Sequence, residues 1–158
     1  MNPTPQKILY VDMDNVLVDF QSGIDRLTEE EKTTYADRLD EVPHIFGKML
    51  PMPDAIESYK RLAAVFDTYI LSTSPWENPT ASHDKFIWVK EYLGKEAYKR
   101  LILSHHKHLN HGDYLIDDRQ AHNGADKFTG EFIHFGSAKF PDWKSVTDYL
   151  LGDAGNEK

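Results

Sequence analysis

Short apolar runs recur along this chain and alternate with stretches in which apolar residues follow helical spacing. Five runs are typical of strands: Ile8–Val11, Thr68–Leu71, Leu101–Leu103, Tyr114–Ile116 and Glu131–Phe135. The first two are short, rich in β-branched or aromatic residues and uninterrupted by charge, which predicts strands buried on both faces.

Amphipathic stretches between these runs predict helices. Thr28 followed by Glu31 has the pattern of a capping box, and Tyr35, Leu39 and Val42 would then lie on one helical face. This helix belongs to an acidic segment, residues 21–50, that follows the first strand.

Three further helices are expected. Asp54 with Glu57 would cap one, a second would run from about Ser82 to Leu93, and Pro141 would occupy the first turn of the last. Their expected core-facing residues are, in order, Ile56, Tyr59, Ala63 and Phe66; Phe86, Val89 and Leu93; and Trp143, Val146 and Leu150.

Strands that alternate with helices predict an α/β fold with a mostly parallel sheet covered on both faces. In such sheets the functional site lies at the carboxyl ends of the strands. Polar residues stand at three of these ends: Asp12 and Asp14, Thr73 and Ser74, and Asp117 and Asp118. One shared site explains this placement better than chance loop composition.

Composition narrows the possible functions. The 158 residues suit a single domain, and a net charge of −8 disfavours binding to long nucleic acid, although it permits a small phosphate ester. There is no cysteine, which excludes thiolate metal sites and cysteine nucleophiles. Residues 1–7 lack a signal-peptide core and no run could span a membrane, so a cytoplasmic location is expected. Residues 152–158 are predicted to form a flexible tail.

The pair Asp12 and Asp14 carries the most information. Residues two apart on a strand point the same way, so both carboxylates would leave the strand end together. Two like charges at one point repel each other, so a positive group that offsets the repulsion is expected there. A divalent cation and a phosphate held by it are the candidates. The alternative is a strand end whose two carboxylates face water.

Hydrolysis of a phosphate monoester would use all of these residues. Asp12 can attack phosphorus, and Asp14 can protonate the leaving oxygen. Asp118, alone or with Asp117, would complete an oxygen-rich Mg²⁺ site. Thr73 and Ser74 offer donors to phosphate oxygens, and Lys107 offers a positive charge. Taken singly, these residues are equally consistent with a turn, a solvated strand end and a surface lysine.

The order Asp-x-Asp, Ser/Thr, Lys, Asp-Asp resembles the haloacid dehalogenase superfamily of phosphatases. More narrowly, five features are similar to motifs of the 5′(3′)-deoxyribonucleotidases: Asp12–Phe20, Thr73–Pro75, Lys85–Val89, Lys107 and Leu115–Arg119. The resemblance covers nearly the whole chain apart from residues 21–50.

This resemblance implies a Rossmann-like three-layer core with a small helical cap, residues 21–50, inserted after the first strand. It implies Asp12 as nucleophile, Asp14 as acid and base, and Mg²⁺ held by Asp12, the Asp14 carbonyl and Asp118. It also implies phosphate contacts from Thr73, Ser74, Lys107 and Lys85. Phe20 would stack against the nucleobase.

The chain departs from the family in the cap, which is shorter and acidic and lacks an aromatic run. Candidates for a base pocket there are Tyr35, Phe46 and Met49, and Phe20 could equally be a core residue that packs the cap onto the sheet.

Two features near the site stay open. His105, His106, His108 and His111 surround Lys107 without a familiar metal-ligand spacing, and could instead tune binding at lower pH. Arg119 would contact substrate or pair with a carboxylate.

The leading hypothesis is therefore a Mg²⁺-dependent phosphatase acting on nucleoside monophosphates. The same chemistry on another small phosphate ester, such as a sugar phosphate, is the second. The third is a non-catalytic phosphate-binding regulator, against which the presence of both Asp12 and Asp14 argues.

Overall fold

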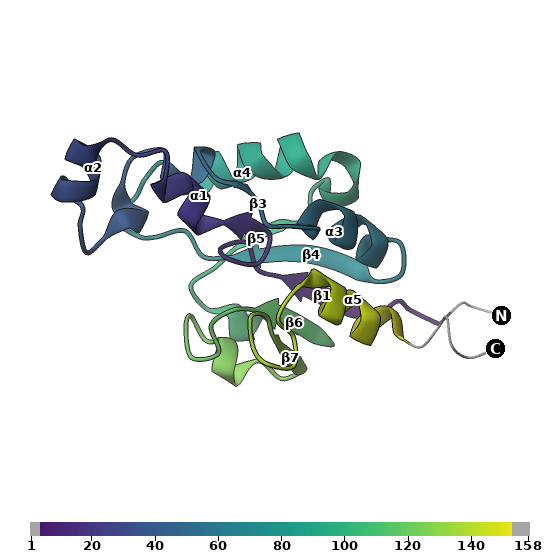
Figure 1. The fold of residues 1–158 in the computed structure, drawn as a ribbon. Coiled ribbons are helices and arrows are strands. Elements are labelled where there is room, and N and C mark those ends of the chain that lie inside the picture. The colour runs from purple at the N-terminus through teal and green to yellow at the C-terminus, as the bar shows by residue number, and fades with distance from the viewer. Residues whose placement is uncertain (1–3, 153–158) are drawn as a thin grey trace.

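A five-stranded parallel sheet forms the centre of the molecule, in the order β5-β4-β1-β6-β7 (Figure 1). The computed structural model describes residues 4–152. The strands of this sheet are β1 (Ile8–Val11), β4 (Asp67–Ser72), β5 (Leu101–Leu103), β6 (Tyr114–Asp117) and β7 (Glu131–His134). All five predicted strands are confirmed, with ends that differ by one residue at most.

The helices lie between these strands along the chain. They are α1 (Phe20–Ile24), α2 (Glu29–Thr34), α3 (Ala55–Ala63), α4 (Ala81–Tyr92) and α5 (Trp143–Leu151). Single 3₁₀ turns are η1 (Leu39–Glu41), η2 (Ile45–Gly47), η3 (Gly94–Ala97), η4 (Lys107–Leu109) and η5 (Ala125–Lys127). A small antiparallel pair, β2 (Val18–Asp19) with β3 (Leu50–Pro51), was not expected from the sequence.

The central strand β1 is buried from both sides, as its apolar composition predicted. Leu9 is paired with Thr68 of β4 and with Tyr114 of β6. Leu9 and Val11 point into the main core, which α3, α4 and α5 complete, whereas Tyr10 points into a smaller cluster on the other face. Asp12, the residue that follows β1, is therefore attached to a strand that is paired on both sides and buried on both faces.

The two faces of the sheet are covered unequally. The smaller cluster contains Leu71 and Leu115 from the sheet and is closed by Ala125 and Phe128 at η5, with no α-helix of the described chain contributing to it. The connections on this side, residues 104–113 and 118–130, form only single 3₁₀ turns. The expected third layer is thus present in reduced form.

The segment from Phe20 to Met49 lies beyond the carboxyl end of β1 (Figure 1). The capping box at Thr28 and Glu31 is confirmed by both of its hydrogen bonds. The expectation that Tyr35, Leu39 and Val42 share one helix is wrong, because α2 ends at Thr34. Two β-branched threonines close this helix, and the chain continues as separate 3₁₀ turns.

Helix α4 presents an unexpected face to the core. Val89 and Leu93 are buried as predicted, but the Phe86 side chain is 48% exposed and Lys85 is fully buried. Lys85 can be buried because its ammonium group has hydrogen-bond partners in the interior.

The predicted beginnings of two helices, α3 and α5, are also wrong in detail. Asp54 precedes α3 with φ of 65° and makes no side-chain cap bond. Pro141 lies one residue before the N-cap of α5, and Asp142 caps that helix through Ser145.

The loop that follows β1 is fixed by backbone hydrogen bonds of its own and by a hydrogen bond from α5. The carbonyl of Met13 accepts hydrogen bonds from the backbone N–H groups of Leu17 and Val18. Within this turn Asn15 adopts a positive φ of 60°. Trp143 of α5 donates its indole N–H to the carbonyl of Val16 at 2.7 Å. The final helix therefore helps to fix the loop that carries Asp14.

Within residues 4–152, no helix combines the length and the apolarity required to cross a bilayer. Apart from Gly152, the predicted tail lies outside the described residues.

Buried Asn78 ties the loop after β4 to the segment beyond β1. Its amide Nδ2 donates to the carbonyl of Asp40 at 2.8 Å and to that of Val42 at 3.1 Å. Its Oδ1 accepts from the backbone and the hydroxyl of Thr80. One side chain thus satisfies four polar groups.

We predict that Asn78→Ala lowers the free energy of unfolding by about 2 kcal/mol, because it leaves buried carbonyls unpaired. Urea denaturation measures this loss. Asn110→Ala is the matched control, since that half-buried amide makes one 3.4 Å bond and should cost less than about 1 kcal/mol. Equal losses in the two variants would contradict the role given to Asn78.

Candidate active site

Five of the six polar residues predicted at the strand ends line one pocket of about 680 Å³. Its wall contains Asp12, Asp14, Phe20, Thr73, Lys107, Asp117, Asp118 and Arg119 from the predicted set. Ser74 and Lys85 do not line it, and the structure places Lys85 directly behind Asp14. The carboxyl edge of the sheet therefore holds the site, as expected.

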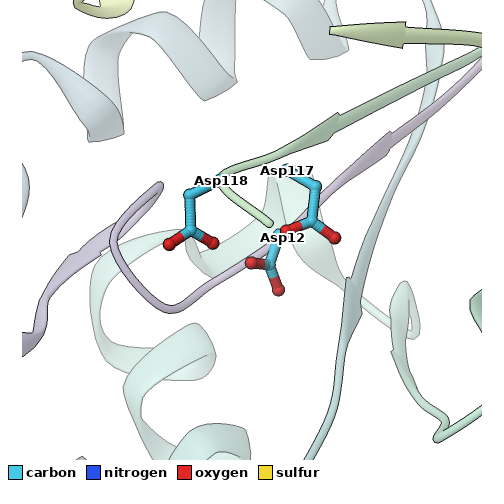
Figure 2. A group of neighbouring side chains, drawn as sticks. All are labelled: Asp12, Asp117 and Asp118. Carbon is cyan, nitrogen blue, oxygen red and sulfur yellow. The ribbon is translucent and has the colours of Figure 1, made fainter. Parts of the chain in front are cut away.

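Three carboxylates converge at the floor of the pocket. Asp12 follows β1, and Asp117 and Asp118 lie at the end of the adjacent strand β6 (Figure 2). One oxygen of each lies within 4.8 Å of the others. Because β1 and β6 are parallel neighbours, their carboxyl ends bring these side chains together.

Lys107 neutralises part of this charge. Its Nζ lies 2.9 Å from Asp12 Oδ1 and 2.7 Å from Asp117 Oδ2, and all three side chains are buried. Burial disfavours the charged ammonium, but the two carboxylates outweigh it and raise the pKa of Lys107. The bond from the Lys107 backbone N–H to the carbonyl of Asn123 holds η4 in place.

The negative charge remains incompletely neutralised. Burial, and next the charge of Asp12, raise the pKa of Asp117 to about 8 and that of Asp118 to about 6. The backbone N–H of Arg119 donates to Asp117 Oδ1. Within the described residues Asp118 takes part in no ion pair, whereas Asp12 and Asp117 share Lys107. A cluster of hard oxygen donors with excess negative charge fits a divalent cation.

Asp14 has a lysine partner of its own, distinct from that of the cluster. Lys85 Nζ lies 3.3 Å from Asp14 Oδ2 and donates to Ser72 Oγ and the carbonyl of Thr73, each at 2.7 Å. The ring of Phe46 lies beneath the same ammonium group at 4.6 Å. Lys85 therefore orients Asp14 in this structure and makes no direct contact with the pocket.

The second carboxylate oxygen of Asp14, Oδ1, is not bound by Lys85. Asp14 Oδ1 is buried and has no hydrogen-bond partner among residues 4–152. Burial raises the pKa of the Asp14 carboxyl, although Lys85 opposes this shift. An acid with one oxygen held and the other unpaired is suited to proton transfer.

The loop after β4 supplies further polar groups. Thr73 donates its hydroxyl to the carbonyl of Ser104 at 2.7 Å, which joins the ends of β4 and β5. The Ser74 hydroxyl is buried without a partner. The Thr73 hydroxyl thus already has a structural bond.

Phe20 faces both the pocket and the core. It lines the pocket while its ring lies edge-on to buried Phe46, with centroids 5.9 Å apart. Phe46 and Met49 are buried, and neither they nor Tyr35 line the pocket. The core contact expected of Phe20 is thus confirmed, whereas its stacking against a nucleobase stays a prediction.

The histidines around Lys107 have different surroundings. His105 lines the pocket, and His106 lies edge-on to His108. Among residues 4–152, no histidine belongs to a group of three or more potential metal ligands. Exposed Arg119 lines the pocket, and its guanidinium makes no ion pair within the described chain.

Sequence reasoning missed several residues of the pocket wall: Asn15, Ala36, Asp37, Leu39, Asp40, Trp76, His122 and Asn123. Trp76 follows Thr73–Pro75 directly, so its position after a strand end was a usable signal. The others come from loops whose path no local pattern indicated.

Solved structures with this fold are hydrolases of the haloacid dehalogenase type. The YfnB protein of Bacillus subtilis bound to magnesium superposes with a TM-score of 0.65 at 12% identity, covering 93% of this chain and 99% of that one. A provisionally described haloacid dehalogenase-like hydrolase of Burkholderia xenovorans LB400 gives 0.53 at 16% identity, covering 96% and 98%. At these identities the likeness defines the fold.

Sequence relatives define the family. Residues 24–143 match the family described as "5' nucleotidase, deoxy (Pyrimidine), cytosolic type C protein". A protein of Vibrio phage KVP40, provisionally named a 5′(3′)-deoxyribonucleotidase, is 60% identical over 150 residues, which is 95% of this chain and 88% of that protein. The human cytosolic-type 5′(3′)-deoxyribonucleotidase is 27% identical over 146 residues, covering 74% and 73%.

The chain belongs to the 5′(3′)-deoxyribonucleotidase family, and its fold is that of haloacid dehalogenase-type hydrolases. It is a phosphatase of the 5′-nucleotidase type, which confirms the predicted family and enzyme class.

We predict that Lys107→Met lowers the free energy of unfolding at pH 7 by about 3 kcal/mol or more, because two buried carboxylates lose their cation. Lys144→Met is the matched control, since its pair with Asp148 is exposed and its loss should leave the stability nearly unchanged. Chemical denaturation compares the two. A loss no larger than that of the control would refute the electrostatic role of Lys107.

Proposed function

We propose that this protein is a Mg²⁺-dependent phosphatase that releases phosphate from deoxynucleoside or nucleoside monophosphates through an aspartyl-phosphate intermediate. The observation that carries the proposal is the placement of Asp12 and Asp14 in one pocket with separate lysine partners. Asp12 belongs to the carboxylate cluster and pairs with Lys107, whereas Asp14 pairs with Lys85. This division supports different roles for the two carboxylates.

Asp12 is the nucleophile in this proposal. A carboxylate oxygen of Asp12 attacks phosphorus while the bond from phosphorus to the ester oxygen breaks, which leaves an acyl phosphate on Asp12. Lys107 holds the Asp12 carboxylate in a fixed orientation at the floor of the pocket. Such positioning removes much of the entropic cost of the attack.

Asp14 is the acid and then the base. It gives a proton to the departing alkoxide, and its carboxylate then takes a proton from the water that hydrolyses the acyl phosphate. Inorganic phosphate leaves and Asp12 is regenerated. The unpaired Oδ1 of Asp14 supports this assignment, because it has no competing hydrogen bond.

We propose that Lys107 and Thr73, which line the pocket, contact the phosphoryl oxygens. Ser74 and Lys85 do not line it, and Lys85 acts through Asp14. Asp12, Asp118 and the Asp14 carbonyl, with Asp117 beside them, would hold Mg²⁺. The ion would supply electrostatic stabilisation of the anionic phosphate as it approaches Asp12.

The substrate class is proposed from the family and the pocket. A volume of about 680 Å³ lies in the range of small-molecule sites and would accommodate a nucleoside monophosphate. Phe20 and Arg119, which line the pocket, are proposed to contact the nucleoside. We propose a single domain with residues 21–50 as its cap, acting in the cytoplasm on a free nucleotide.

We predict that Asp12→Asn reduces phosphate release by about 10⁴-fold, because an amide is a poor nucleophile. Asp14→Asn should reduce it comparably for substrates with poor leaving groups. Release of inorganic phosphate measures both effects. Asp19→Asn is the matched control, because this half-buried aspartate in β2 lies outside the pocket. Equal rates for wild type and Asp12→Asn would exclude the covalent mechanism.

A substrate panel tests the substrate class. Deoxynucleoside monophosphates should be hydrolysed with a higher kcat/KM than sugar monophosphates of the same charge. Faster turnover of sugar phosphates than of every nucleotide would instead favour the alternative of a sugar phosphatase.

We predict that Mg²⁺ at about 100 times its Kd stabilises the wild type by about 2.7 kcal/mol, since it binds only the folded cluster. Thermal unfolding with and without Mg²⁺ measures this shift independently of turnover. Asp118→Asn should abolish most of it, whereas Asp148→Asn, at an exposed surface position, should keep it. Full retention in Asp118→Asn would argue against the proposed metal ligands.

A further inference from the structure

Trp76 stands at the edge of the pocket with 83% of its surface exposed. The other two tryptophans, Trp88 and Trp143, are 3% and 1% exposed. Exposure of so large an apolar side chain costs hydrophobic free energy unless a partner covers it.

The turn that carries Trp76 is rigid. The backbone N–H of Asn78 donates to the carbonyl of Pro75 at 3.0 Å, which closes the turn around Trp76. The side chain of Asn78 is bonded to Asp40 and Val42 in the segment beyond β1. The indole is therefore presented in a defined place with little freedom to collapse onto the surface.

His105 supports the indole from one side. The two rings are 5.7 Å apart and nearly perpendicular, at 72°. An edge-on neighbour fixes the indole ring and leaves ring surface available to another flat group. The His105 ring thus orients Trp76 without covering it.

The pocket has a charged floor and partly apolar walls. Asp12, Lys107 and the other charged groups described above form the floor, whereas Phe20, Leu39 and Trp76 contribute apolar surface to the walls. A ligand whose phosphate lies at Asp12 and whose other end is a flat, apolar-faced ring would match both parts.

We propose that Trp76 is the stacking platform for the nucleobase and sets the preference for nucleotides over base-free phosphate esters. This inference rests on the proposed nucleotidase function. Phe20 then serves as a secondary contact, because its ring is already engaged with Phe46. Base–aromatic stacking tolerates any base, so Trp76 favours nucleotides as a class.

The first test compares a deoxynucleoside 5′-monophosphate with 2-deoxyribose 5-phosphate, which has the same sugar and phosphate but no base. In Trp76→Ala, the ratio of kcat/KM for the nucleotide to that for the sugar phosphate should fall about 10-fold. Most of the change should appear in the KM of the nucleotide. Trp76→Phe should restore most of the ratio.

Tyr98→Ala is the matched control. Tyr98 is 69% exposed and lies outside this pocket, so its loss should leave the ratio unchanged. An unchanged ratio in Trp76→Ala would overturn the inference, and so would an equal fall in the control.

The second test uses fluorescence of Asp12→Asn, which binds nucleotide without turnover. Because Trp88 and Trp143 are buried, nucleotide should quench mainly the solvent-exposed emission of Trp76. The quenching should disappear in the double variant with Trp76→Phe and should be absent with 2-deoxyribose 5-phosphate. Quenching that persists in the double variant would overturn the inference.

The two proposals can fail separately. If the wild type prefers sugar phosphates to every nucleotide, the proposed function falls. If it prefers nucleotides and Trp76→Ala keeps the full preference, the function stands and the role of Trp76 falls.

Discussion

Asp12, Asp117 and Asp118 place three carboxylates in a largely buried space, where their repulsion must be offset for the fold to persist. Lys107 offsets part of it by reaching two of them at 2.9 and 2.7 Å. Burial, and next the charge of Asp12, raise the pKa values of Asp117 and Asp118, so part of the repulsion remains. The β5–β6 connection, which carries Lys107, and the ends of β1 and β6 are thus coupled by one electrostatic requirement.

The same requirement explains the second lysine. Buried Lys85 pairs with Asp14, whereas Lys107 pairs with Asp12, so the two carboxylates of the Asp-x-Asp motif have different surroundings. Acid–base chemistry and nucleophilic attack need such different environments within a few ångströms. The scaffold meets this need with cations from two connections, α4 after β4 and η4 after β5.

The strands, four of the helices and the sheet edge that holds the candidate site could be predicted because each has a local signature. Apolar runs indicated the strands, and the Asp-x-Asp and Asp-Asp motifs indicated where β1 and β6 end. Other features had no such signature. Lys85 lies on a helix whose spacing favoured Phe86 as a core residue, and only the interior partners Ser72 and Thr73 make burial of a lysine tolerable.

The sequence by itself determined the parallel sheet, the family and the identity of the candidate reactive carboxylates, because these follow from short-range patterns. The tertiary structure decided which charges are paired, how α2 ends, and that Trp76 stands exposed over the pocket while Trp88 and Trp143 are buried. These outcomes depend on contacts between residues far apart in the chain. Their free energies come from burial and charge pairing, which no local pattern records.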